Sequence, residues 1–289
     1  MRIIVLGASG QIGAIVLEGL NRHHQVKGTS RRASEKYLRF DPFTDDWSLL
    51  GKADAIINCI GQIEPTQTSS FYDLHVELIK LMLNNRNKMG QPRIVQISAL
   101  GAAPHHQVEF LQTKGIGDEL LLQAANTVIL RPSIICTHRT MIVRKMLLLS
   151  QIARYAAGVV LVPRGFLKTR IQPVMPNDLI DAIERVLSPI ENRVVNVVGP
   201  VAISFSEILS RLSEARHQSL HITQVPRILA DPMVRIALAR IAPHVINSQQ
   251  YELLFEDNIA NPEPLQQLLQ RQLMSTSGFF KNEFSHAAD

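Results

Sequence analysis

The sequence predicts an α/β protein in which a doubly wound parallel sheet is accompanied by a smaller, mostly helical C-terminal lobe. One observation is the opening segment, where an apolar run passes through three spaced glycines into a helical pattern. A second is that strand-like runs alternate with helical patterns over residues 1–200. Consecutive parallel strands need a crossover connection, which is usually a helix. The alternation therefore favours a parallel sheet with helices on both faces.

The opening segment, residues 1–13, has the pattern of a nucleotide-binding turn. Residues 2–6 are apolar and β-branched without polar alternation, as in a central strand that is buried on both faces. The glycines permit a tight turn, close approach of backbone amides to a pyrophosphate, and close packing of the next helix on the strand. The phosphates would lie at the positive end of that helix. This is the Rossmann arrangement, and the residues expected to hold the cofactor are Gly7, Ala8, Ser9, Gly10, Gln11, Ile12 and Gly13.

Hydrophobic periodicity predicts the remaining elements. In the expected dinucleotide-binding core, residues 1–133, the strands are 25–30, a short strand before Phe40, 53–61, 93–98 and 127–130, and the helices are 47–50, 71–89 and 110–125. The expected smaller lobe covers residues 134–289, with segments of residues 171–200 returning to complete the core. Its elements are an amphipathic basic helix at 141–155, a helix at 178–187, a strand at 194–198, a helix at 204–214 with Ser204 and Glu207 at capping-box spacing, and largely helical structure after Pro226.

The end of the second strand bears on the choice of cofactor. It reads Ser30, Arg31 and Arg32, and the first acidic residue after it is Glu35. An acidic residue at this place accepts hydrogen bonds from the adenosine ribose, whereas arginine pairs with a 2′-phosphate. The sequence therefore predicts NADP(H) in preference to NAD(H), with NAD as the other possibility. The alternative interpretation is that both arginines are exposed loop charges.

Composition favours a reduced, cytoplasmic protein with a substantial core. The chain has 289 residues, of which 46% are hydrophobic. Its two cysteines, Cys59 and Cys136, lie far apart in strand-like runs, and the sequence shows neither a signal peptide nor an apolar stretch of roughly 18 residues. The ten histidines are scattered without accompanying ligands at chelating spacing, so no metal site is predicted.

The net charge of +5 is unevenly distributed. No acidic residue lies between Glu119 and Asp178, so this stretch contributes +8 and the remainder −3. Such a block indicates an anionic partner, which could be a phosphorylated ligand, an acidic protein or an anionic membrane surface; the alternative is a solvated basic face. Nucleic acid is not expected, because the block shows no pattern of interleaved aromatic side chains. The basic residues are Arg131, Arg139, Arg144, Lys145, Arg154, Arg164, Lys168 and Arg170.

Further motifs follow the glycine turn in a definite order along residues 1–200. They are Asp41, a strand that ends at Gly61, Ser98 at a strand end, Lys114 with Gly117 and Glu119 after it, Arg131-Pro132-Ser133, and Gln172-Pro173-Val174 with Asp178. In this order the chain resembles an atypical short-chain dehydrogenase/reductase. It is similar to the group that contains NAD-dependent epimerase/dehydratase-like proteins and the dehydrogenase-like accessory subunit of respiratory complex I.

The resemblance implies a role for each matching position. The glycine turn would hold the pyrophosphate, Arg31 or Arg32 the ribose phosphate, and Asp41 the adenine. The dinucleotide would pass Ile60 and Gly61 and end at Pro132 and Ser133, which would line the nicotinamide. Lys114 would hold the nicotinamide ribose hydroxyls, and Ser98 stands where the family has its substrate-orienting serine. The residue-level alternatives are that Ser98 merely finishes a strand and that Lys114 is a surface lysine.

The sequence departs from the family at the proton donor. Catalytic members have a tyrosine four residues before the lysine, and here that residue is Phe110. Phenylalanine cannot act as a general acid or base. No tyrosine lies between Tyr72 and Tyr155, and the nearest titratable residues before the helix are His105 and His106.

Three functions remain open from the sequence. The first is a weakly catalytic or non-catalytic NAD(P)-binding protein with a structural, sensing or assembly role. The second is an NADP-dependent reductase, epimerase or dehydratase with a relocated proton donor. The third is a module that docks to an acidic protein or a membrane through the basic segment 131–170.

Overall fold

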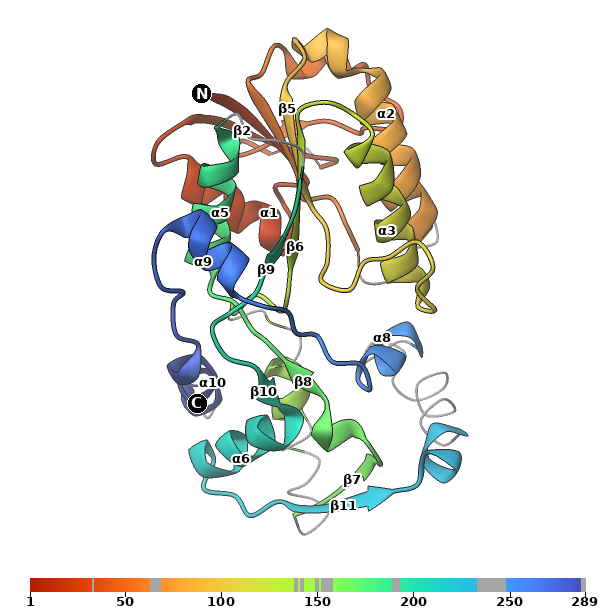
Figure 1. Cartoon of the computed structure of the whole chain (residues 1–289), viewed down its shortest axis with the longest axis vertical. Helices are drawn as coiled ribbons and strands as arrows, with labels where there is room; N and C mark the ends of the chain where they lie inside the picture. The colour runs from red at the N-terminus through yellow and green to blue at the C-terminus, as the bar shows by residue number, and fades with distance from the viewer. Residues whose placement is uncertain are drawn as a thin grey trace. The chain divides into compact units, whose positions relative to one another are not determined.

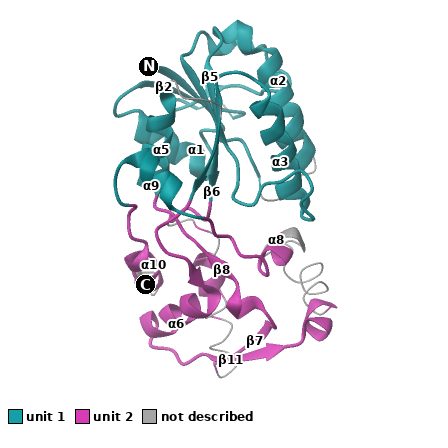
Figure 2. Ribbon diagram, viewed as in Figure 1, with its two compact units in different colours: residues 1–132, 176–197, 261–272 teal, residues 133–175, 198–260, 273–289 magenta. Residues whose placement is uncertain are grey.

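The computed structural model describes residues 1–32, 34–62, 69–137, 140, 143–148, 151, 158–188, 193–232 and 248–286. The chain divides into two compact units, each built from three separate stretches (Figure 2). Unit 1 comprises Met1–Pro132, Pro176–Val197 and Asn261–Gln272. Unit 2 comprises Ser133–Met175, Val198–Ala260 and Leu273–Asp289.

Unit 1 contains a seven-stranded sheet in which every neighbouring pair is parallel. The strand order is β3-β2-β1-β4-β5-β6-β9. The central strands β4 and β5 are buried along their whole length, because helices cover both faces, and this explains their largely apolar sequences. The strands are β1 (Arg2–Leu6), β2 (Gln25–Ser30), β3 (Leu38–Arg39), β4 (Ala55–Asn58), β5 (Arg93–Ile97), β6 (Thr127–Pro132) and β9 (Arg193–Val197).

Two groups of helices cover the sheet (Figure 1). One face carries α1 (Gln11–Leu20), α5 (Pro176–Leu187) and α9 (Glu263–Leu269), which contact one another in that order. The other face carries a π-helical segment, η2 (Asp73–Glu77), that continues into α2 (Leu78–Asn84), together with α3 (Glu109–Leu122). The parallel sheet between two helical layers confirms the predicted fold class.

The strand order reverses between β1 and β4, and ligands of doubly wound sheets bind at such a point. The turns that follow these two strands pack against each other. Gly7 follows β1 with a φ of 73°, and a Cβ on it would lie 2.9 Å from the Ile60 side chain in the turn after β4. Helix α1 is equally close, because a Cβ on Gly13 would lie 2.2 Å from the Gly7 carbonyl oxygen. The two glycines are therefore needed for this packing.

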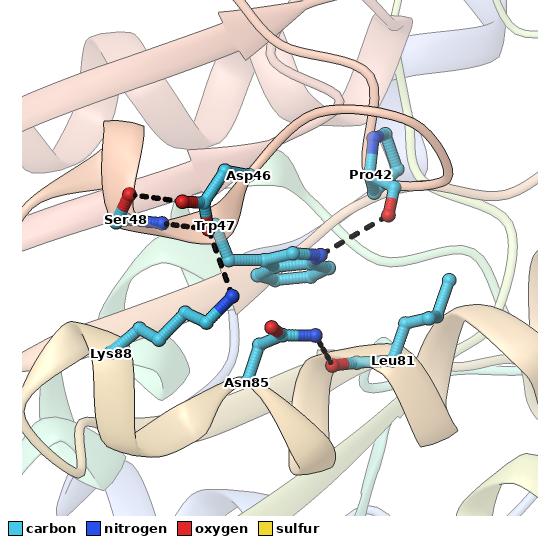
Figure 3. Close-up of polar contacts among 7 residues, drawn as sticks. All are labelled: Pro42, Asp46, Trp47, Ser48, Leu81, Asn85 and Lys88. Atoms are coloured by element: carbon cyan, nitrogen blue, oxygen red, sulfur yellow. Dashed lines mark hydrogen bonds and ion pairs between the residues drawn. The ribbon is translucent and has the colours of Figure 1, made fainter.

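The segment after β3 is anchored to the end of α2 by polar contacts (Figure 3). The Trp47 indole nitrogen donates to the Pro42 carbonyl oxygen at 3.1 Å, and the ring packs edge-on against Phe40. Asp46 caps the 3₁₀ helix η1 (Trp47–Leu50) and accepts from Lys88 in η3 (Arg86–Met89) at 2.9 Å. The hydrogen bond from Lys88, with those from Ser48, lowers the pKa of Asp46. These contacts hold the loop that begins at Asp41.

Unit 2 has its own apolar core, to which Phe166, Phe205, Phe280 and Phe284 contribute. Its helices include α6 (Phe205–Ala215), α8 (Ser248–Leu253) and α10 (Ser277–His286). It also holds two small sheets: β7 (Val159–Pro163) with β11 (His221–Val225) in parallel, and β8 (Arg170–Ile171) with β10 (Ile203–Ser204) in antiparallel orientation.

Most predicted elements of unit 1 occur within a few residues of their expected bounds. The helix expected at 71–89 is instead a succession of π-helical, α-helical and 3₁₀ segments. The capping box of Ser204 and Glu207 at the start of α6 is confirmed. The four short strands of unit 2 are additions to the largely helical lobe that was expected. Of the expected basic helix at 141–155, residues 143–148 are helical, and 141, 142, 149, 150 and 152–155 lie outside the described residues.

Within the described part of the chain, no helix has both the length and the apolar character needed to cross a bilayer.

Substitution of Gly13 by alanine is expected to destabilise unit 1 by about 1–3 kcal/mol, because the added methyl group has no space against the Gly7 carbonyl. The matched control is Gly278→Ala in α10, where a Cβ meets no atom within 4 Å. That variant should be as stable as the parent or more stable, since alanine favours a helix. Chemical denaturation of the three proteins measures both effects, and equal stabilities would contradict the packing described for Gly13.

Candidate dinucleotide site

The predicted cofactor residues of unit 1 gather at one edge of the sheet. Gly7 follows β1, Arg31 follows β2, Gly61 follows β4, Ser98 follows β5 and Pro132 ends β6. Since all these strands are parallel, their carboxyl ends lie at the same edge. Lys114 reaches this edge from α3, with its Nζ donating to the Ile97 carbonyl oxygen at 3.3 Å.

The turn before α1 has the features needed to bind a pyrophosphate. Gly10 is the N-cap residue, and its amide donates to the Gly7 carbonyl at 3.0 Å. Among the described residues no side chain caps this helix, and its first turn carries no acidic group. Ser9, Gly10 and Gln11 are exposed, whereas Ala8 and Gly13 are buried and Ile12 is half-buried. The positive helix end is therefore formed by backbone at an exposed glycine turn, which fits a phosphate group.

The residues expected to contact the adenosine half of a dinucleotide lie after β2 and β3. Ser30 is buried, and its hydroxyl accepts from the Arg32 amide at 3.2 Å, whereas the side chains of Arg31 and Arg32 are exposed. Asp41 is half-buried, and one carboxylate oxygen accepts from the Phe43 amide at 3.1 Å. The Asp41 carboxylate thus helps to form the turn in which it lies.

The Phe110 ring lies beside the Lys114 amine. Lys114 Nζ lies 5.6 Å from the centroid of the Phe110 ring. Phe110 also packs edge-on against Phe71, with ring centroids 5.8 Å apart, and against His75, at 5.6 Å. The Lys114 amine is therefore bordered on this side by an apolar ring and not by a hydroxyl group.

Lys114 is 6% exposed, which excludes the alternative of a surface helix lysine. Burial lowers the pKa of Lys114 to about 8, opposed by the charge of Asp118. Cys59, in the turn after β4, lies near the same amine, and burial raises the pKa of its thiol to about 12. The lysine therefore carries a positive charge at neutral pH only at a cost in stability.

His75 is the member of this site that sequence reasoning did not identify. It is 3% exposed, stacks on Phe71, and shares a hydrogen bond of 2.8 Å between Nδ1 and the Thr113 hydroxyl. Burial, with a smaller effect of Lys114, lowers the pKa of His75 to about 2, so the ring is neutral. The only sequence signal is its position on the apolar helix face with Phe71, Leu78 and Met82.

Ser98 belongs to a buried polar network. Its hydroxyl donates to Asp118 Oδ2 at 2.9 Å, and the same oxygen accepts from Arg131 at 2.8 Å. Burial raises the pKa of Asp118, and the charge of Arg131 lowers it. The hydroxyl proton of Ser98 is therefore already used within the protein, and the sequence did not single out Asp118 as its acceptor.

The remaining candidates are Ser133, which follows Pro132, and the two histidines before α3. Pro132 is the last residue of unit 1 before the chain enters unit 2, where the Ser133 hydroxyl donates to the side-chain oxygen of Asn258 at 2.6 Å. His105 is exposed, and Nδ1 of His106 accepts from the Val108 amide at 3.0 Å. Neither the exposed position of His105 nor the hydrogen bond of His106 brings an imidazole ring to the Lys114 amine.

The basic block is partly neutralised by acidic residues outside it. Arg131 pairs with the buried Asp118, and Arg170 forms two side-chain hydrogen bonds with Asp257. Lys145 donates to the Gln250 side chain at 2.7 Å. Arg139 and Arg154 lie outside the described residues. A basic docking face remains a prediction.

The part of the chain that the structure describes contains no group of three or more His, Cys, Asp or Glu side chains placed to hold a metal ion.

Comparison with solved structures shows the fold to be that of NAD-dependent epimerases and dehydratases, the extended short-chain dehydrogenases/reductases. UDP-glucuronic acid 4-epimerase from Bacillus cereus, in complex with UDP-glucuronic acid and NAD, matches with a TM-score of 0.72 and 16% identity over 99% of this chain and 98% of that chain. RMD from Pseudomonas aeruginosa, complexed with NADPH, matches with a TM-score of 0.68 and 14% identity over 99% of both chains. A tyrosine-to-phenylalanine mutant of the Bacillus cereus epimerase, holding a fluorinated UDP-glucuronic acid and NAD, matches with a TM-score of 0.71 and 15% identity over 99% and 98%.

Two curated proteins are similar in sequence. The chain is 22% identical over 280 residues to the mitochondrial NADH-ubiquinone oxidoreductase 40 kDa subunit of Neurospora crassa, covering 90% of this chain and 72% of that protein. It is 24% identical over 244 residues to the mitochondrial NADH dehydrogenase (ubiquinone) 1 alpha subcomplex subunit 9 of Arabidopsis thaliana, covering 79% and 59%. No family model matches the sequence. These findings confirm the resemblance derived from the motifs.

The buried Lys114 predicts a specific dependence of stability on pH. A pKa of about 8 in the folded state, against 10.5 in the unfolded chain, means that the unfolded state binds more protons between these values. The free energy of unfolding should therefore rise between pH 8 and pH 10.5, by up to about 3 kcal/mol for the difference in pKa. Lys114→Met should remove this rise and should be more stable than the parent at pH 7.

The control is Lys80→Met, at a half-exposed lysine whose Nζ lies 2.8 Å from Glu77. Urea denaturation across this pH range would measure all three proteins. The Lys80→Met variant should keep the rise in the free energy of unfolding. If Lys114→Met also kept the full rise, the buried position of the Lys114 amine would be refuted.

Proposed function

We propose that this chain is a dinucleotide-binding protein that prefers NADP(H) and has lost most or all of the catalytic activity of its fold. The observation that carries the proposal is the packing of the Phe110 ring against Lys114 at the proton-donor position. Binding and chemistry use different parts of such a site, so one can persist without the other. Its role would then be structural, sensing, or in assembly with a partner.

The groups needed for binding are retained. The exposed glycine turn at the start of α1 would hold the pyrophosphate, and Asp41 would face the adenine. Arg31 and Arg32 stand after β2, where a 2′-phosphate would need a cationic partner. Lys114 would hold the nicotinamide ribose, near Ile60 and Gly61. Pro132 and Ser133 would line the nicotinamide.

Among the described side chains beside Lys114, neither Phe110 nor Ser98 nor His75 offers a free proton for transfer. Phe110 has no ionisable group, and the Ser98 hydroxyl donates to Asp118. His75 is neutral at physiological pH because its pKa is lowered to about 2, so it holds no imidazolium proton to give. When bound, the dinucleotide would supply hydride chemistry, while the chain would supply positioning and positive charge.

Two of the similar proteins support the separation of cofactor binding from catalysis in this chain. The tyrosine-to-phenylalanine mutant of the Bacillus cereus epimerase is in complex with NAD, so a protein of this fold can hold the cofactor after one of its tyrosines is replaced by phenylalanine. The Neurospora protein is named as a subunit of an oxidoreductase, which favours an assembly role for this chain also. The chain spans 72% and 59% of the lengths of the two curated relatives. That it shares the whole role of either relative is therefore part of the proposal.

NADPH is expected to bind more tightly than NADH. A charged arginine contact to the 2′-phosphate contributes about 1.5–3 kcal/mol, which corresponds to a difference of about 10- to 150-fold in Kd. Calorimetric or fluorescence titration of the parent and of the double variant Arg31→Ala, Arg32→Ala measures the preference. Equal affinities of the parent for the two cofactors, or a preference that survives in the double variant, would be evidence against a role for these arginines.

Turnover is expected to be weak or undetectable on carbonyl, alcohol and nucleotide-sugar substrates. Loss of a positioned acid or base typically lowers the rate by about 10²- to 10⁴-fold. Phe110→Tyr should fold, because the two rings have nearly the same shape, and should increase any residual turnover with NADPH. The parent, Phe110→Tyr, His105→Ala and His106→Ala would be compared by following nicotinamide absorbance.

The competing hypothesis is a working enzyme with a relocated proton donor. It predicts that the parent turns over at an ordinary enzymatic rate and that replacement of His105 or His106 abolishes this rate. That result would replace the non-catalytic function proposed here, while leaving the cofactor proposal intact.

A further inference from the structure

The imidazole of His75 has one nitrogen with a partner and one without. Nδ1 lies 2.8 Å from the Thr113 hydroxyl oxygen. Nε2 is fully buried and has no hydrogen-bond partner in the described structure. A buried polar atom without a partner is destabilising, and such atoms in folded proteins are rare enough to need a specific explanation.

The unpaired nitrogen lies beside Gly61 and near Lys114. If Gly61 carried a Cβ, this atom would lie 3.8 Å from His75 Nε2 and 3.3 Å from Lys114 Nζ. The backbone of Gly61 therefore lies close to both nitrogens, with no side chain of its own between them. Lys114 Nζ donates to the Ile97 carbonyl oxygen at 3.3 Å, and an ammonium group has three protons to donate. Two buried nitrogens thus lie beside Gly61, in the turn after β4 at the carboxyl edge of the sheet.

The chemistry of these nitrogens favours a hydroxyl group as their partner. The Thr113 hydroxyl is 2.8 Å from the Glu109 carbonyl as well as from His75 Nδ1, so its single proton can go to either. In the first case Nε2 is an acceptor, and in the second it is a donor. A hydroxyl both donates and accepts, so it fits either tautomer, whereas an ionised phosphate only accepts. It also accepts readily from a lysine.

We propose that His75 Nε2 is a second contact, beside Lys114, for the ribose hydroxyls on the nicotinamide side of a bound dinucleotide. A vicinal diol would present one hydroxyl to each nitrogen. The π-helical turn that contains His75 agrees with this role, since such turns occur frequently at functional sites. The inference rests on the proposed dinucleotide-binding function and adds a residue that the motifs did not indicate.

Two amide substitutions separate binding from packing. The side-chain amide of His75→Asn can replace Nδ1 and keep the contact with Thr113, but it has no atom at the position of Nε2. The longer side chain of His75→Gln can place an amide at the position of Nε2. His75→Phe keeps an aromatic ring against Phe71 and Phe110 but has neither nitrogen. It tests the loss of Nε2 if the Asn variant does not fold. Thermal unfolding checks the fold of each variant.

The probes are NADPH, NADH and 2′,5′-ADP, which contains the adenosine half of NADPH without the second ribose. We expect the Asn and Phe variants to bind NADPH about tenfold more weakly than the parent, as for the loss of one hydrogen bond. The Gln variant should stay within about threefold of the parent. All the variants should bind 2′,5′-ADP with the affinity of the parent.

Each other outcome has a definite meaning. Equal NADPH affinities in the parent, Asn, Phe and Gln proteins would overturn the proposal and leave an ordered water as the partner of Nε2. Loss of 2′,5′-ADP binding, or a Gln variant as weak as the Asn variant, would show a packing role instead. A parent that binds neither NADPH nor NADH would refute the proposed function itself, and this inference with it.

Discussion

The direct packing of helix α3 on the π-helical segment η2 determines the geometry of the candidate site. A Cβ on Gly117 would lie 2.1 Å from the His75 carbonyl oxygen, so the two backbones meet with no side chain between them. Phe110, Lys114 and Gly117 recur at helical spacing, so they lie on one face of α3. The contact that brings Gly117 to η2 therefore also brings the Phe110 ring and the Lys114 amine to His75.

Several buried polar groups at this sheet edge oppose stability. Lys114 is charged at neutral pH in a buried position, Asp118 is buried beside Arg131, and Nε2 of His75 has no hydrogen-bond partner among the described residues. Each is unfavourable compared with an apolar residue of similar size. Natural proteins depart from the rules of core packing mainly where function requires it. The concentration of such departures beside the glycine turn is thus consistent with a binding site, even though the proton-donor position is apolar.

The sequence predicted the sheet and the glycine turn between β1 and α1 well because both depend on local patterns. Apolar runs without alternation mark buried parallel strands, and Gly7 and Gly13 occupy backbone positions that other residues cannot take. It did not predict β11, whose sequence HITQV is mostly polar and which pairs with β7 about sixty residues earlier in the chain. The spacing of Phe110 and Lys114 predicted their shared site. His75 escaped detection, because a histidine on an apolar helix face looks like an ordinary core residue until its missing partner is seen.

The division of each unit into three stretches has a consequence for biosynthesis. As the chain leaves the ribosome, β1 to β6 can assemble once residue 132 has emerged, but β6 then has an unpaired edge. Its partner β9 follows only after Ser133–Met175 and helix α5 have been made, and α9, which contacts β9, follows later still. An unpaired parallel edge is prone to wrong pairing with other chains. The period between the synthesis of β6 and that of β9 is therefore when the nascent protein is most exposed to aggregation and most dependent on chaperones.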